Sequence, residues 1–131
     1  MTPEQIEHQA EVLYKALRTR QTLTPLTESN PDISIEQAYQ ISKSILQLRM
    51  QDGEKLVGKK IGLTSKVVQD MLGVHQPDFG FLTDTMMYES DSELPFDKEL
   101  IQAKSEGEIA FILKQDLVGP NITPEMVLEA T

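Results

Sequence analysis

The spacing of hydrophobic residues predicts two amphipathic helices in the first part of the chain. In the first helix, apolar side chains recur at intervals of three and four residues, at Ile6, Ala10, Leu13, Ala16 and Leu17. Thr2 is a suitable N-cap for it, and Gln5 stands where a capping box needs a glutamine. The second helix repeats this arrangement, with Ser34 as N-cap and Gln37 in the capping box, and we expect it to stop before Gly53.

A strand-like stretch follows at residues 55–63, where glycines interrupt the alternation of apolar and polar side chains. Lys60 falls on the same face as Gly58 and Gly62, so it projects from a surface without neighbouring side chains. Glycine weakens a strand. A strand commonly contains glycine where a ligand or another backbone approaches it closely. Lys60 is therefore a candidate for binding an anion. A solvated lysine on a bulged edge strand is the alternative interpretation.

An aspartate lies on the next connection, at residues 75–80. Pro77 restricts the residue before it and Gly80 permits a tight turn, so we expect Asp78 on a constrained loop. Constrained loops often carry catalytic groups, which makes Asp78 a second candidate. In the alternative interpretation, Asp78 only bonds its own backbone in a common type of turn.

Weaker signals complete the prediction of secondary structure. Residues 81–82 and 86–88 have the composition of short strands, and Thr123 with the proline after it marks the start of a further helix. Together with the first two helices, these segments predict an α+β fold in which N-terminal helices precede a mixed β-sheet.

Residues 104–113 predict a strand that carries two carboxylates. As a strand, this stretch would put Glu106 and Glu108 on one face, with their Cα atoms roughly 7 Å apart. Two carboxylates at this separation can converge on one small, hard cation. The alternative is a solvated strand end where the glutamates pair with Lys104.

Composition excludes several classes of protein. The 131 residues are 39% hydrophobic and 25% charged, which is typical of one ordinary globular domain. The net charge of -9 argues against a surface for nucleic acid or anionic membrane. The chain contains no cysteine, which excludes disulfides and thiolate metal sites and is consistent with a cytoplasmic protein. We expect neither a transmembrane helix nor a signal peptide.

Three motifs resemble those of a known enzyme family. They are Val-Gly-Lys-Lys-Ile-Gly-Leu-Thr at residues 57–64, Gly-Val-His-Gln-Pro-Asp-Phe-Gly at 73–80 and Ser-Glu-Gly-Glu-Ile-Ala-Phe at 105–111. In this order and spacing they resemble the 2-keto-4-pentenoate hydratase and 4-oxalocrotonate decarboxylase family, which belongs to the fumarylacetoacetate hydrolase superfamily. The resemblance implies a fumarylacetoacetate-hydrolase-like β-fold and metal-dependent chemistry on 2-oxo acids.

The resemblance also implies roles for the candidate residues. Glu106 and Glu108 match the first two acids of the family's metal triad, which holds Mg²⁺ or Mn²⁺. Lys60 matches the active-site lysine and Asp78 the loop aspartate, which assist proton transfer and position the water in the hydratases. These roles agree with the preference of a hard cation for oxygen ligands and with acid–base catalysis.

The chain departs from the resemblance in its length. Family members are about twice as long, and their third metal-binding glutamate lies beyond the point that corresponds to Thr131. We therefore expect a helical segment at residues 1–53 and, at 54–131, only the N-terminal part of a β-rich catalytic domain. Such a chain is expected to have little or no activity alone.

The function implied is addition of water to 2-hydroxypenta-2,4-dienoate, which gives 4-hydroxy-2-oxopentanoate in the meta-cleavage of aromatic compounds. Two alternatives stay open: a 4-oxalocrotonate decarboxylase, and a truncated, non-catalytic partner subunit. The expected partners are the small-molecule acid and further protein copies, as a homo-oligomer or as a complex with the related decarboxylase or hydratase. Nucleic acid and membrane are not expected partners.

Overall fold

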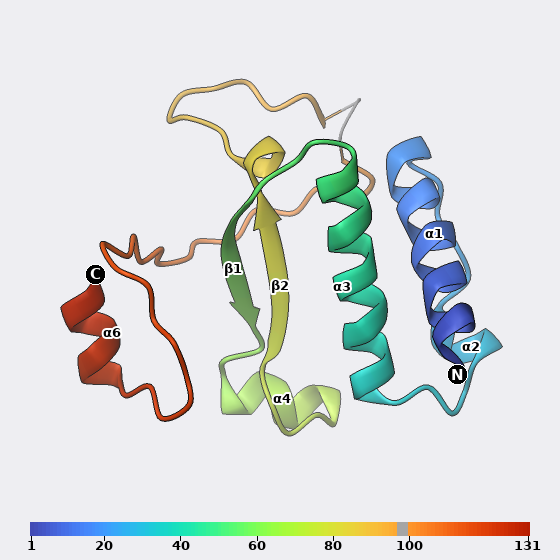
Figure 1. Cartoon of the computed structure of the whole chain (residues 1–131), viewed down its shortest axis with the longest axis horizontal. Helices are drawn as coiled ribbons and strands as arrows, with labels where there is room; N and C mark the ends of the chain where they lie inside the picture. The colour runs from blue at the N-terminus through green and yellow to red at the C-terminus, as the bar shows by residue number, and fades with distance from the viewer. Residues whose placement is uncertain (97–99) are drawn as a thin grey trace. The chain divides into compact units, whose positions relative to one another are not determined.

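The computed structural model describes residues 1–96 and 100–131, which divide into two compact units, Met1–Ile101 and Gln102–Thr131 (Figure 1). The first unit contains, in chain order, α1 (Pro3–Thr19), α2 (Leu26–Ser29), α3 (Ile35–Gln51), β1 (Leu56–Gly62), α4 (Lys66–Leu72), β2 (Asp78–Thr83) and the 3₁₀ helix η1 (Asp84–Met86). The second unit contains α6 (Pro124–Ala130). The α+β class is therefore confirmed. None of the helices in the described ranges has the length and apolar character that a membrane span requires.

Both long helices begin with the predicted capping boxes. The Thr2 hydroxyl accepts the backbone N–H of Gln5 at 3.3 Å, and the Gln5 side-chain oxygen accepts the N–H of Thr2 at 2.7 Å. Ser34 and Gln37 make the same pair of bonds at the start of α3, each at 3.2 Å. Because these bonds satisfy backbone donors that a helix leaves open, they define where each helix starts.

A small apolar core joins α1 and α3, which lie side by side (Figure 1). Its buried members are Ile6 and Ala10 of α1 and Ile41 of α3. Partly buried apolar residues surround them: Met1, Leu13, Leu26, Ile33, Ile45 and Leu48. The predicted apolar stripes of the two helices are thus the surfaces that pack on each other.

The two strands form an antiparallel ribbon with one irregularity. Leu56 pairs with Thr83 and Gly58 with Leu82, so the register shifts between Leu56 and Gly58. The strand predicted at residues 55–63 is confirmed, but β2 already begins at Asp78 rather than after the predicted loop. Asp78, which was predicted on a loop, is therefore the first residue of β2, because it pairs with a residue of β1.

Other strand predictions are wrong. Residues 84–86 are a 3₁₀ helix where a strand was expected at 86–88, and residues 104–113 belong to no strand. Ile109 and Ile112 are 85% and 86% exposed. Alternation only marks residues that could pair, whereas a strand needs a neighbour for its backbone groups. Within the described residues, the sheet is consequently two-stranded and antiparallel rather than mixed.

The second unit contains the third predicted helix. Thr123 caps α6, and its hydroxyl accepts the backbone N–H of Met126 at 3.3 Å. The backbone N–H of Lys114 donates to the carbonyl of Ala130 at 2.7 Å, which ties the extended segment to the end of the helix. Ala130 is fully buried.

Candidate functional site

The ribbon brings Lys60 and Asp78 to one of its faces. Lys60 lies opposite Gly80, and Gly62 lies opposite Asp78. Directly opposed residues share a face, and residues on the diagonal stand about 7–8 Å apart. Lys60 is half-buried and Asp78 is exposed. An ammonium and a carboxylate at this separation can both reach one small substrate.

Glycines occupy the positions between these two charged residues. A Cβ at Gly80 would stand 3.9 Å from the Cβ of Lys60. At Gly62 a Cβ would overlap the carboxylate oxygen Oδ1 of Asp78, so that carboxylate would have to move. The close approach that the glycine pattern predicted is therefore made, at Gly62, by the Asp78 side chain.

Phe79, on the other face of the ribbon, contacts α3. The ring of Phe79 packs on Tyr39 with 6.0 Å between centroids and an angle of 49° between planes. The backbone N–H of Phe79 also donates to the Tyr39 hydroxyl at 3.2 Å. Since neighbouring residues of a strand point to opposite faces, Asp78 and Lys60 belong to the face that does not make this contact.

A buried glutamate that no motif in the sequence marks, Glu54, joins the helices to the end of the ribbon away from α4. The side chain of Glu54 is 4% exposed. Its Oε2 accepts the hydroxyl of Thr83 at 2.6 Å, that of Thr85 at 2.9 Å and the Arg49 Nη1–H at 2.8 Å. Its other oxygen accepts a hydrogen bond from Arg18. One carboxylate therefore contacts groups from α1, α3, β2 and η1.

These hydrogen bonds change the acidity of the carboxyl group. Burial by itself would raise the pKa of Glu54, but the bonds from Thr83, Arg49, Arg18 and Thr85 outweigh it and lower the pKa to about 2. Glu54 is thus ionised at any physiological pH. It acts as a fixed negative charge rather than as a proton donor or acceptor.

An outer layer of contacts surrounds Arg18. Its Nε–H donates to the Tyr14 hydroxyl at 2.8 Å, and its guanidinium lies over the Tyr14 ring, 4.9 Å from the centroid. The Tyr14 hydroxyl in turn donates to Asp52 at 2.5 Å. Burial raises the pKa of the Tyr14 hydroxyl, and its bond to Asp52 acts in the same direction.

The predicted metal ligands lie in the second unit. Glu106 and Glu108 are exposed, in an irregular segment, whereas Lys60 and Asp78 belong to the first unit. Two carboxylates are the donor type that a hard cation prefers. Within residues 1–96 and 100–131, however, no three His, Cys, Asp or Glu side chains gather where they could hold a metal. The donor chemistry therefore suits the predicted cation, but the number of ligands falls short in the described part of the chain.

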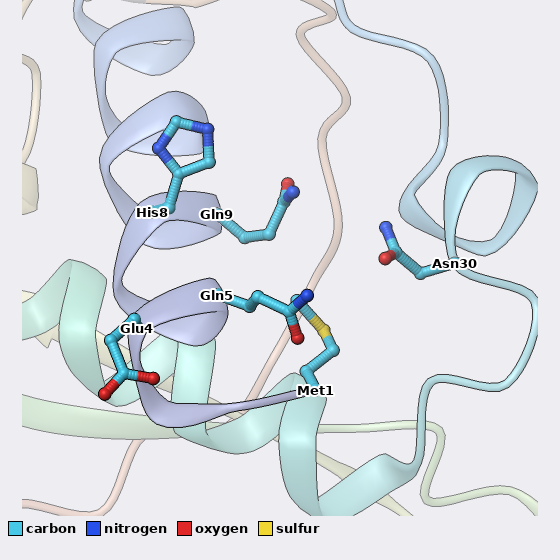
Figure 2. Close-up of a pocket in the computed structure, with 6 residues that line it drawn as sticks. All are labelled: Met1, Glu4, Gln5, His8, Gln9 and Asn30. Carbon is cyan, nitrogen blue, oxygen red and sulfur yellow. The ribbon is translucent and has the colours of Figure 1, made fainter.

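Figure 2 shows an open hollow beside the start of α1. It is lined by Met1, Glu4, Gln5, His8, Gln9 and Asn30. Gln5 already serves the capping box there. None of the four predicted site residues lines this hollow, so we assign no function to it.

Comparison with solved structures indicates the class of protein to which this fold corresponds. The chain matches 4-oxalocrotonate decarboxylase from Pseudomonas putida G7, in complex with magnesium and adipate, with a TM-score of 0.63 and 32% identity. The match covers 65% of this chain and 32% of the decarboxylase. A structure of the same enzyme with calcium and acetate matches with the same TM-score and identity. The matched part thus has the fold of the corresponding part of this decarboxylase.

Sequence comparison identifies particular relatives, and these are hydratases. The chain is 58% identical, over 91% of its length, to a 2-hydroxypent-2,4-dienoate hydratase of Pseudomonas putida. It is 57% identical, over 96% of its length, to a 2-hydroxyhexa-2,4-dienoate hydratase of Comamonas testosteroni. These matches cover 54% and 48% of the two relatives, so the chain spans about half the length of the curated relatives it matches. No family model matches the chain. The resemblance inferred from the three motifs is confirmed: the chain is a homologue of the dienoate hydratases.

Proposed function

We propose that this chain forms the N-terminal part of a hydratase that adds water to 2-hydroxypenta-2,4-dienoate and yields 4-hydroxy-2-oxopentanoate in aromatic meta-cleavage. The observation that carries the proposal is the 58% and 57% identity to two named dienoate hydratases. The matched stretches of 119 and 127 residues span the three motifs that hold the candidate residues. In the domain organisation that we propose, residues 1–53 are a helical segment and 54–131 begin a fumarylacetoacetate-hydrolase-like catalytic domain.

The proposed catalytic residues are Lys60 and Asp78. Hydration requires one group that takes a proton from water and another that delivers a proton to carbon. A carboxylate suits the first task and an ammonium group the second, so Asp78 is the proposed base and Lys60 the proposed acid. Their common face, on which Gly62 faces Asp78 and Gly80 faces Lys60, supports these roles.

The proposed metal ligands are Glu106 and Glu108, for Mg²⁺ or Mn²⁺. Their carboxylates suit a hard cation, and the matched decarboxylase structures contain magnesium or calcium. When bound, such an ion supplies Lewis acidity to the substrate's 2-oxo group. With only two donors in the described residues, metal affinity and turnover of this chain alone are expected to be low.

The activity test follows the loss of the dienol and the formation of 4-hydroxy-2-oxopentanoate in the presence of Mg²⁺. Lys60→Met should abolish whatever turnover the chain has, because it removes the proposed proton donor. Lys59→Met is the matched control, since Lys59 is the neighbouring residue on the opposite face. Equal loss in both variants would contradict the assignment of Lys60.

A second candidate function is the decarboxylase, which the match to 4-oxalocrotonate decarboxylase structures favours. It is distinguished by substrate, since a decarboxylase releases CO₂ from the dicarboxylate and leaves the dienol unchanged. The third possibility, a non-catalytic partner subunit, would appear as co-purification with a full-length homologue without any turnover. We further propose that the whole protein is cytoplasmic and oligomeric.

A further inference from the structure

The connection between the two strands leaves their register open. In a tight hairpin the turn fixes which residues pair. Here β1 and β2 are joined by residues 63–77, which include α4, and no tight turn imposes a register. Gly58 and Gly62 in β1 and Gly80 in β2 lie in one face of the ribbon, and glycine-rich strands specify their pairing weakly. Something other than the turn must therefore hold the pairing in place.

The opposite end of the ribbon carries specific contacts. Glu54 and Lys55 directly precede β1, while Thr83 ends β2. The Thr83 hydroxyl donates to Glu54 at 2.6 Å. Beside it, the backbone N–H of Lys55 donates to Asp84 Oδ1, and the N–H of Asp84 donates to the Lys55 carbonyl, both at 2.9 Å. These bonds join the start of β1 to the end of β2, at the end of the ribbon opposite the connection formed by residues 63–77.

The Glu54 carboxylate cannot easily follow a shifted strand, because it is bound to both long helices. Arg49, with a side chain only 12% exposed, holds one of its oxygens at 2.8 Å, and Arg18 bonds to the other. Such charge-assisted hydrogen bonds are the stronger ones in proteins. The buried Glu54 carboxylate therefore stays at one position. The strand β2 must then place a hydrogen-bond donor at that position.

In the observed register Glu54 accepts hydroxyl hydrogen bonds from both Thr83 and Thr85, and a slip by one residue would withdraw both donors. A slip by one residue would bring Leu82 or Asp84 to the place of Thr83. Leucine has no donor, and a second carboxylate would repel the first. The same slip would send Lys60 and Asp78 to opposite faces, because the side-chain period of a strand is two residues.

We propose that Glu54 is a positioning residue that sets the register of β1 against β2 through Thr83 and thereby keeps Lys60 and Asp78 on one face. The consequence for catalysis rests on the proposed function, whereas the register itself does not. The test therefore measures pairing in the absence of substrate and metal, so that a failed activity assay and a failed register test remain distinguishable.

The experiment uses the isotopically labelled chain and cross-strand nuclear Overhauser effects. Contacts between Lys59 and Phe81 and between Ile61 and Phe79 report the native pairing. Thr83→Val removes the hydroxyl and keeps the shape, so these contacts should be lost or joined by a second set, and strand amides should exchange about tenfold faster. Thr83→Ser restores the hydroxyl and should restore both signals.

Glu54→Gln should produce the same loss, because an amide is a weaker acceptor and leaves two guanidinium groups without their charge partner. The matched control is Asp52→Asn, which removes a nearby carboxylate that contacts Tyr14 and Arg18. This control should keep the native contacts.

Three outcomes would overturn the proposal. One is native cross-strand contacts in both Thr83→Val and Glu54→Gln. Another is a failure of Thr83→Ser to restore what Thr83→Val loses. The third is an equal loss of amide protection in α1 and α3 in the Thr83 variant, because the cluster would then support the whole unit rather than the register.

Discussion

Acid should destabilise the first unit largely through Glu54, and the size of this effect follows from its hydrogen bonds. The pKa of Glu54 is about 2 in the folded chain, against an ordinary value of 4.5. A folded pKa below the unfolded one means that the stabilisation is complete above about pH 5 and is lost as the pH falls towards 2. The difference of roughly 2.5 pH units corresponds to about 3 kcal/mol of the free energy of unfolding.

The assay is urea-induced unfolding, followed by far-ultraviolet circular dichroism at several values between about pH 7 and pH 2. Glu54→Gln has no titratable group at this position. Its free energy of unfolding should therefore decrease less steeply than that of the wild type as the pH is lowered. The stability difference between the two proteins should shrink by about 3 kcal/mol across this range. At neutral pH the variant should be less stable, since it leaves buried arginine charge unpaired.

Asp52→Asn is the control, because the Asp52 side chain is 59% exposed and contacts the same Arg18. Exposed ion pairs contribute little to stability, so this variant should keep the wild-type dependence on pH. Parallel curves for the wild type and Glu54→Gln would refute the reasoning, because they would mean that Glu54 does not bind its proton differently in the folded and unfolded chain.

The remaining predictions concern the ribbon, a helix cap and the metal ligands. Gly62→Ala should force the exposed Asp78 carboxylate to turn away from the new Cβ and should cost less than about 1 kcal/mol, whereas Gly107→Ala, with open space around it, should displace no side chain. Thermal unfolding compares the stability of the two variants. Ser34→Ala should cost about 1 kcal/mol, measured in the same way, because it removes an N-cap bond. Replacing Glu106 and Glu108 together by glutamine should abolish calorimetric binding of Mn²⁺, and unchanged binding would place the metal elsewhere.

Local elements were predictable because their causes lie within a few residues. The capping box of Ser34 and Gln37 spans four positions, so a short stretch of sequence contains both of its partners. The alternation of glycines around Lys60 likewise predicted a strand with a bare face. A similar alternation at residues 104–113 gave a wrong prediction of a strand. A strand also requires a neighbouring strand to pair with, and the local pattern does not reveal one.

The candidate site was predictable in its residue types and only partly in its geometry. Lys60 and Asp78 were recognisable from their motifs. They are eighteen positions apart in the chain, however, and their common face depends on the register between two strands. Asp78 was expected on a loop because the turn residues before it were visible, whereas its partner strand was not. Glu106 and Glu108 were singled out as a pair, and their role as ligands stays a prediction.

The sequence by itself determined where the helices start and which side chains can carry the chemistry, since caps, periodicity and side-chain type are local properties. Only the tertiary structure decided that Glu54 is a buried anchor. Its partners Arg18, Thr83 and Thr85 lie 36, 29 and 31 positions away, so no local pattern distinguishes it from an exposed glutamate after a helix. Folding brings these groups together, and the resulting hydrogen bonds rather than the residue type fix its charge and its place at the end of the ribbon.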